Sequence, residues 1–262
     1  MMLARLVFPC LLLIACQAQA GRSCSDAPPT PEAVRKGLEL ALKTRSALDA
    51  NAAQTALVAR VGRDLSRYGL RYSHLAIAWR DHPAGRWFVV HQLNACGTAA
   101  SDIYDEGLGN FFLDDLHAHD ALLLIPPRDL QQRLAALLQA KSVLSLHAPN
   151  YNMVAHPFST RYQNSNQWVL ETLAAAMAPA GSVNSRSDAQ AWLRNTGFAP
   201  TTLAIGAVER LGARVGRANI AFDDHPPERR FAGRIDTVSV ESVAGFVLRH
   251  TSGTQSLTIR LD

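Results

Sequence analysis

The chain has 262 residues and a mass of 28.5 kDa, which is enough for one large domain or for a domain with a small appendage. Apolar residues make up 48% and charged residues 18%, a composition that supports a packed core and excludes an intrinsically disordered chain. The formal charge of +4 is spread along the sequence without a dense basic run, so we expect no nucleic-acid partner.

The N-terminal segment predicts export. Arg5 precedes an apolar run at 6–15, and "AQAG" offers a cleavage site after Ala20, so residues 1–20 are predicted to be a signal peptide. The segment "LIAC" also fits a lipobox, in which Cys16 is lipidated and becomes the first residue. Both alternatives place the mature protein in the periplasm or outside the cell. Neither leaves an integral membrane span, because the apolar run is too short.

Two cysteines, Cys24 and Cys96, remain after cleavage at Ala20. In an oxidising compartment such a pair predicts one disulfide, which ties the N-terminal tail to the segment after "VVHQLNAC". The alternative is a pair of reduced, buried thiols.

A linker at 21–30 precedes a segment with helical periodicity at 31–50. Three strands are predicted next, in "TALVARVG", "SHLAIAWRD" and "RWFVVHQL", and the turn "DHPAG" joins the last two as an antiparallel hairpin. The stretch 98–120 is predicted to be loop-rich, with a short helix at 111–116. "ALLLIPP" is typical of a buried strand, and "RDLQQRLAALLQAKS" of an amphipathic helix.

Further helices are predicted from 165 to about 178, at 187–195 and at 200–212, and a C-terminal β region at "ANIAFDD", "DTVSVESVAGFVLRH" and "QSLTIRLD". Strands, then helices, then strands predict an α+β fold in which an antiparallel sheet packs against helices. We expect a core at 31–200, with 201–262 as a helix plus β extension of the same domain.

His74 and His91 are the first candidate site residues. Strand alternation places His74 on one face with Ala76 and Ala78. These small residues leave room for a helix, and we expect the alanine-rich helix after Ser165 to pack there. His91 lies in the neighbouring strand. Two histidines that face one helix can act as a base and its orienting partner.

Ser165, in "YQNSNQWV", stands at the start of a predicted helix. A helix N-terminus carries partial positive charge, and its unpaired N–H groups can receive an oxyanion. The position therefore suits a nucleophile. It equally suits a serine that only caps the helix, and the sequence leaves both interpretations open.

No cofactor or metal is expected. The two histidines of "LHAHD" have no further ligands at typical spacing, and the glycines of "DEGLGN" do not form a dinucleotide-binding fingerprint.

The phrases "YSHLAIA" and "NSNQWV" resemble the circularly permuted papain-like hydrolases, which include the lecithin:retinol acyltransferase branch and bacterial NlpC-type proteins. The resemblance implies a permuted papain-like core at 31–200. It places Ser165 where these enzymes carry a cysteine nucleophile, His74 at the general base and His91 at the third, polar position. Over nearly the whole chain, "RVGRDLSRYGLRYSHLAIAWRD", "VVHQLNACG", "YDEGLGNFF" and "YQNSNQWVLE" also resemble an exported bacterial family called domain of unknown function 2145. No activity is established for that family.

Two functions stay open. The first is a catalytically silent module that binds or scaffolds an unknown cell-envelope ligand or peptide. The second is a Ser/His/His hydrolase or acyltransferase acting on an amide, ester or thioester of the envelope. In it Ser165 attacks, and His74 must take its proton because serine is too weak an acid to form a stable ion pair. Residues predicted to line the cleft or oxyanion site in either case are Gln163, Asn164, Asn166 and Trp168.

Overall fold

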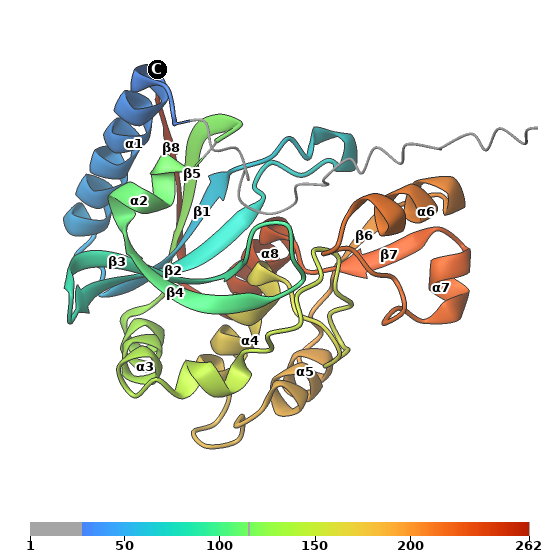
Figure 1. The fold of residues 1–262 in the computed structure, drawn as a ribbon. Coiled ribbons are helices and arrows are strands. Elements are labelled where there is room, and N and C mark those ends of the chain that lie inside the picture. Colours follow the sequence, from blue (N-terminus) through green and yellow to red (C-terminus); the bar gives the residue numbers. More distant parts are fainter. Residues whose placement is uncertain (1–27, 115, 262) are drawn as a thin grey trace, which may run out of the picture.

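The computed structural model describes residues 28–114 and 116–261 (Figure 1). The signal peptide, the lipobox at Cys16 and most of the linker lie outside the described residues. Cys24 also lies outside them, so its pairing with Cys96 stays a prediction. Cys96 lies in an exposed turn between two strands.

The fold is built on a six-stranded sheet in which every neighbouring pair of strands is antiparallel. The strand order is β4-β3-β2-β1-β5-β8. All seven residues of the central strand β1 are buried, because helices cover both faces of the sheet (Figure 1). The strands are β1 (Thr55–Val61), β2 (His74–His82), β3 (Gly85–Asn94), β4 (Ser101–Gly107), β5 (Ala118–Ile125) and β8 (Gln255–Arg260).

One face of the sheet packs against α1 (Pro31–Ala50) and α2 (Leu108–Leu113). The alanines Ala76 and Ala78 of β2 belong to this apolar cluster. His74 shares their face, as the alternation predicts, and its ring centroid lies 5.9 Å from that of Phe111 in α2. The space above the small alanines is therefore filled by the α1–α2 layer.

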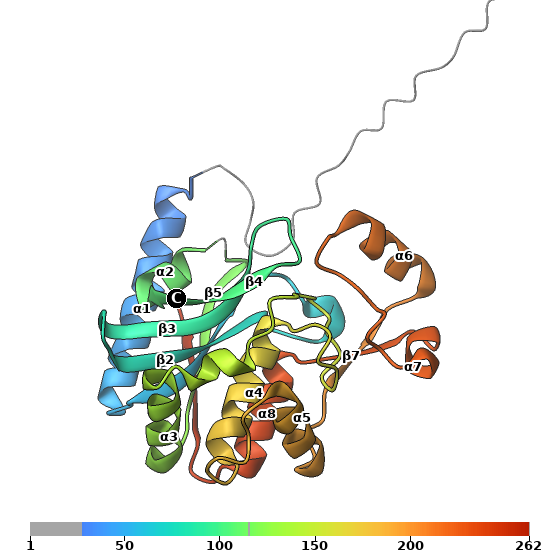
Figure 2. The ribbon, with the colours of Figure 1, turned by 60° about the horizontal axis from the view of Figure 1, so that its bottom comes forward.

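The opposite face packs against α3 (Arg128–Gln139) and α4 (Ser165–Met177) (Figure 2). The helices α5 (Arg186–Asn195) and α8 (Val240–His250) pack in turn against α4. A 3₁₀ helix, η2 (Ser142–Leu146), follows α3. Our prediction that α4 covers the His74 face is therefore wrong. Trp168, Leu170 and Leu173 give α4 a bulky apolar surface, and this surface packs with Leu75 and Ile77 on the other side of the sheet. These larger side chains offer it more apolar contact than alanines do.

A smaller unit lies at one end of the molecule (Figure 1). It consists of the two-stranded antiparallel sheet β6 (Thr201–Ala204) and β7 (Arg234–Thr237) with the helices α6 (Ala207–Gly216) and α7 (Pro227–Phe231). Its own apolar cluster includes Leu203, Ile205 and Ile235. We call residues 201–237 the β6–β7 unit.

The structure confirms the predicted α+β fold and the β2–β3 hairpin, but it corrects four segments. The predicted β segment "ANIAFDD" (218–224) forms no strand and connects α6 to α7. Residues 101–107, predicted to be loop, form β4, and the segment 200–212 divides into β6 and the start of α6. Much of the predicted C-terminal β region is the helix α8. A capping box between Ser239 and Ser242 starts that helix. Its buried residues Val243, Phe246 and Val247 follow a helical spacing, which prevails over the β propensity of valine.

Candidate active site

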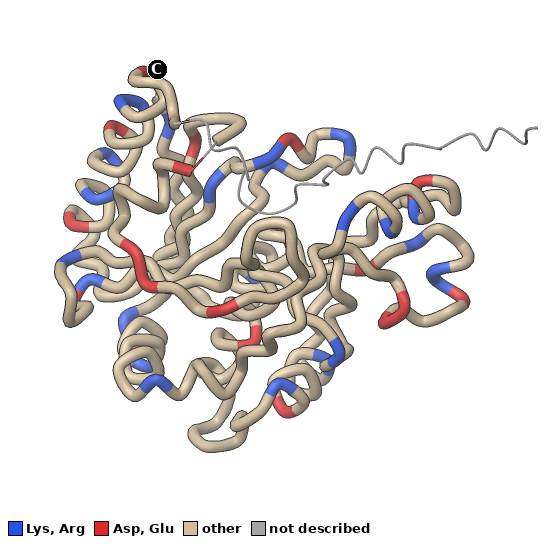
Figure 3. Tube along the Cα trace, viewed as in Figure 1, with Lys and Arg blue, Asp and Glu red and all other residues tan. Residues whose placement is uncertain are grey.

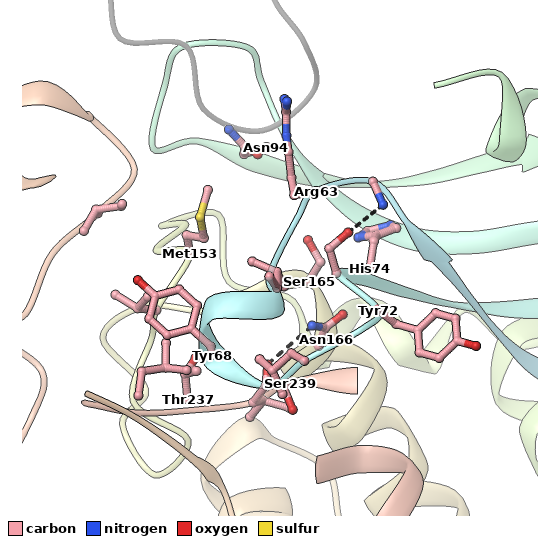
Figure 4. Close-up of a pocket in the computed structure, with 18 of the residues that line it drawn as sticks. Arg63, Tyr68, Tyr72, His74, Asn94, Met153, Ser165, Asn166, Thr237 and Ser239 are labelled. Carbon is pink, nitrogen blue, oxygen red and sulfur yellow. Dashed lines mark hydrogen bonds between the residues drawn. The ribbon is translucent and has the colours of Figure 1, made fainter. Parts of the chain in front are cut away.

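A pocket of about 400 Å³ lies where the main sheet, the start of α4 and the β6–β7 unit meet. His74, Ser165 and Asn166 line it, and so do Tyr68 of the 3₁₀ helix η1 (Ser66–Tyr68) and Met153 (Figure 4). Much of the remaining wall is aliphatic. Charged side chains, among them Arg60, Arg63 and Glu209, complete the lining. A pocket of this size with aliphatic and polar walls suits a small ligand or a substrate group.

Ser165 is the first residue of α4, and Asn164 is its N-cap. The Asn164 side chain accepts a hydrogen bond of 2.8 Å from Gln167 N, so the capping role belongs to Asn164 and not to Ser165. The Ser165 side chain is 7% exposed and faces the pocket. Within the described residues, the backbone N–H groups of Ser165 and Asn166 donate no hydrogen bond. These two N–H groups are available to an anionic oxygen.

Asn166 fixes the start of α4 against the start of β2. Its Oδ1 accepts a hydrogen bond of 2.9 Å from Leu75 N, and its Nδ2 donates to Val238 O at 3.4 Å. Asn166 and Leu75 directly follow Ser165 and His74 in the sequence. The hydrogen bond therefore holds Ser165 and His74 at the same end of the pocket, although the body of α4 lies on the other face of the sheet.

His74 heads a chain of buried polar groups that crosses three strands. Its Nε2 lies 2.8 Å from His91 Nδ1, and His91 Nε2 lies 3.1 Å from Glu106 Oε1. The pairing registers place all three side chains on one face of the sheet, from β2, β3 and β4. His91 is fully buried, and Glu106 is 12% exposed.

This chain selects the tautomers of both rings. The negative charge of Glu106 favours the proton of neutral His91 on Nε2, which lies 3.1 Å from Glu106 Oε1 but outside hydrogen-bond geometry, and this leaves His91 Nδ1 as an acceptor. His74 Nε2 must then donate to it. The Nδ1 of His74 consequently carries a free lone pair. No hydrogen bond within the described residues occupies it, and His74 lines the pocket.

Burial keeps both histidines neutral. It lowers the pKa of His74 well below the ordinary value for histidine, and the positive charge of Arg60 acts in the same direction. Burial also lowers the pKa of His91, although Glu106 opposes this. His74 therefore presents an unprotonated ring to the pocket at neutral pH.

Three of the residues predicted to line the cleft have other partners. Gln163 donates to Leu146 O and to Glu171, Asn164 donates to Thr237 Oγ1, and Trp168 donates to Val143 O. None of the three lines the pocket, and Trp168 is fully buried in the core. The structure therefore places these three side chains away from the pocket, because adjacent residues of a helix start point in different directions. Asn166 alone of the four reaches the pocket wall.

The segment that leads into α4 is held by a buried ion pair. Arg186 Nε lies 2.8 Å from Glu171 Oε2, with side-chain exposures of 7% and 0%. Arg186 also donates to the carbonyl oxygens of Thr160 and Tyr162, and Gln163 donates to Glu171 at 2.6 Å. This network positions residues 159–163, which immediately precede the capping residue and Ser165.

Sequence reasoning missed two partners of the site. The sequence predicts a loop at Glu106, where no face can be predicted, whereas strand alternation across 101–107 places it on the face of His91. Tyr151 also lines the pocket beside Ser165, and burial raises the pKa of its hydroxyl. It lies in an irregular segment with no periodic signal.

A second histidine pair predicts a pH dependence of stability. The His156 and His225 ring centroids lie 5.3 Å apart, and burial, with the nearby His225, lowers the pKa of His156 to about 4. The unfolded chain therefore binds more protons between pH 6.5 and 4, so the free energy of unfolding falls as the pH drops through this window. Because His156 is only half-buried, we expect it to account for about 1–2 kcal/mol of the fall in the free energy of unfolding.

Urea unfolding at pH 7 and pH 4.5 measures the contribution of His156 to this pH dependence. The variant His156→Gln should lose less stability than the wild type between the two pH values, whereas His250→Gln, at an exposed position, should match the wild type. Equal losses in His156→Gln and the wild type would contradict the assignment.

The fold and site define a class: an α+β protein with a pocket lined by a serine at a helix start and by the first histidine of a buried His–His–Glu chain. The chain belongs to the family described as "Uncharacterized protein conserved in bacteria (DUF2145)", whose model matches residues 47–247. No curated protein and no solved structure matches it.

Within residues 28–114 and 116–261, no helix is both long and apolar enough to cross a membrane. The same residues hold no group of three or more His, Cys, Asp or Glu side chains arranged to bind a metal ion.

Proposed function

We propose that this protein is an exported serine-dependent hydrolase or acyltransferase with a papain-like site, which acts on an amide, ester or thioester of the cell envelope. The observation that carries the proposal is the His74–His91–Glu106 chain. It leaves an unprotonated nitrogen on His74 in the pocket that Ser165 also lines, which is what a general base requires.

In the proposed reaction, Ser165 Oγ forms a bond to the carbonyl carbon of the substrate while His74 Nδ1 takes the hydroxyl proton. The backbone N–H groups of Ser165 and Asn166 donate to the resulting oxyanion. His74 then gives its proton to the leaving amine, alcohol or thiol as the bond to that group breaks. Water, or an acceptor alcohol or amine, attacks the acyl-serine in the same way and releases the acyl group.

The partners of His74 suit this cycle. When His74 carries a positive charge, its Nε2–H continues to donate to His91 Nδ1. The negative charge of Glu106, on the far side of His91, stabilises the imidazolium through that ring. His91 and Glu106 are thus positioning residues that hold the tautomer and offset the cost of charging a buried ring.

A fluorophosphonate probe tests the proposal, because it reacts with activated serines. We expect it to label the wild type at Ser165, with the adduct identified by peptide mass spectrometry. Ser165→Ala should abolish labelling, and His74→Ala should slow it by about a hundredfold or more, as loss of a general base does. Ser182→Ala, at an exposed serine beyond α4, is the matched control. A folded wild type that takes no label would refute a serine nucleophile.

A second candidate function rests on Tyr151. It lines the pocket together with Ser165, where its hydroxyl can hold a polar group of a ligand, as expected in a silent module that only binds an envelope ligand in the pocket. In this case the probe leaves Ser165 unlabelled. Substitutions of pocket residues such as Met153→Glu then change ligand binding without any associated turnover.

A further inference from the structure

The helix α6 has its apolar side turned toward solvent. Val208, Leu211 and Val215 are 87%, 67% and 81% exposed. Their spacing of three and four residues places them on one stripe of the helix, which we call the α6 stripe. A surface helix normally buries such a stripe in its own protein, so this orientation requires an explanation.

The opposite side of α6 is fixed to the protein by polar groups. Glu209 and Arg217 line the pocket, and Glu209 Oε1 accepts hydrogen bonds from Arg67 at 2.6 Å and from Tyr68 at 3.2 Å. Arg210 donates to Ile205 O at 2.8 Å. Rolling the helix to bury the α6 stripe would break these contacts. The stripe is therefore held outward by the pocket side of the same helix.

The size of the α6 stripe limits what can cover it. Three aliphatic side chains offer about 300 Å² of apolar surface, whereas a stable protein–protein interface buries about 800 Å² on each partner. The stripe is too small to hold a second protein chain by itself. It is large enough for reversible insertion into the boundary between lipid headgroups and acyl chains.

The charge around α6 favours an anionic surface. Residues 207–234, which span α6 and α7, contain six arginines and four acidic residues (Figure 3). Arg210 and Arg217 lie on the pocket side of α6, and Arg229 pairs with Asp236. Arg214, which is exposed and adjoins Val215, lies next to the α6 stripe. Arginines beside an exposed apolar stripe are the pattern of a helix that lies in an anionic membrane interface.

We propose that the α6 stripe docks the protein on an anionic lipid surface. Val208, Leu211 and Val215 enter the headgroup–acyl boundary, and the exposed Arg214 beside them contacts a lipid phosphate. Because the other side of α6 lines the pocket, docking brings the pocket next to the membrane. The proposal does not depend on whether Ser165 is reactive.

Vesicle sedimentation tests the proposal with the full chain carrying Cys16→Ser, which cannot be lipidated at that residue. The vesicles contain either phosphatidylethanolamine with about one third phosphatidylglycerol or phosphatidylcholine alone. We expect binding to the anionic vesicles, weakened by salt. The triple variant Val208→Ser, Leu211→Gln, Val215→Ser should bind at least about tenfold more weakly.

Two variants serve as controls. Leu42→Gln changes an aliphatic residue of α1 that is 61% exposed and should bind as the parent does. Leu211→Gln alone should weaken binding in part, and it keeps the test valid if the triple variant does not fold. Equal binding by the parent and the triple variant, or no binding by the parent, would overturn the proposal. So would a dimer in light scattering that the triple variant abolishes, since the stripe would then be a protein interface.

Discussion

The variant Ser165→Cys is expected to carry a thiol that reacts with iodoacetamide at pH 6 at least about ten times faster than an ordinary cysteine. Residue 165 is the first residue of α4, where the helix dipole favours an anion. His74, whose Nδ1 is unprotonated in the pocket, can accept the thiol proton. Both effects lower the pKa of a thiol below its ordinary value of about 8.5.

The measurement is the alkylation rate between pH 5 and 9, followed by mass spectrometry, with the wild type as the background for the native cysteines. Ser182→Cys, in the exposed turn beyond α4, provides an ordinary thiol for comparison. The double variant Ser165→Cys, His74→Ala should lose most of the rate at pH 6. If Ser165→Cys reacts no faster than Ser182→Cys, or if His74→Ala leaves its rate unchanged, the assignment of the active site is wrong.

The largest loss of stability is expected from Arg186→Met. This substitution leaves the carboxylate of Glu171 fully buried without its cation, and it removes the donors to the carbonyl oxygens of Thr160 and Tyr162. Breaking one side of a buried ion pair costs about 3–5 kcal/mol. For a chain of this size the melting temperature should fall by about 10 °C.

Thermal and urea unfolding measure the loss, and two comparisons identify its cause. The double variant Glu171→Gln, Arg186→Met removes both charges and should recover a large part of the stability, because no unpaired charge remains. Arg35→Met, in an exposed pair with Glu32 on α1, should leave the melting temperature unchanged. A loss in Arg186→Met that the double variant does not reduce would show that packing, and not the buried charge, is responsible.

The same network links stability to the site. Arg186 and Gln163 hold the segment before Asn164 and Ser165, so a folded Arg186→Lys variant should show slower labelling of Ser165. Lysine keeps the charge of arginine but cannot reproduce the forked donors that contact Glu171 and two carbonyl oxygens together. The labelling rate at a temperature well below unfolding separates this effect from global destabilisation.

Several elements were predictable because their signals are local. The alternation in "SHLAIAWRD" placed His74 with Ala76 and Ala78, and the turn "DHPAG" predicted the β2–β3 hairpin. Residue composition alone gives the wrong secondary structure for the α8 segment. Its valines suggest a strand, and the capping box at Ser239 with buried Val243 and Val247 gives a helix.

Local sequence signals also fail to assign the roles of three neighbouring residues of the site. Asn164, Ser165 and Asn166 share one turn-like sequence, yet one caps the helix, one faces the pocket and one binds the β2 backbone. Sequence patterns could locate this junction, but they could not assign the three roles. A change of one residue at a helix start rotates a side chain by about 100°, and only the packing of α4 decides where each side chain points.

The sequence by itself determined the α+β class, the histidine-bearing hairpin and the start of α4 at Ser165, because period, turn chemistry and capping act over a few residues. Only the tertiary structure decided that α4 packs on the face opposite His74. It alone joined Glu106 to His91 and turned the α6 stripe outward. These outcomes depend on which surfaces lie opposite each other across the sheet and the pocket, and segments distant in the chain supply those surfaces.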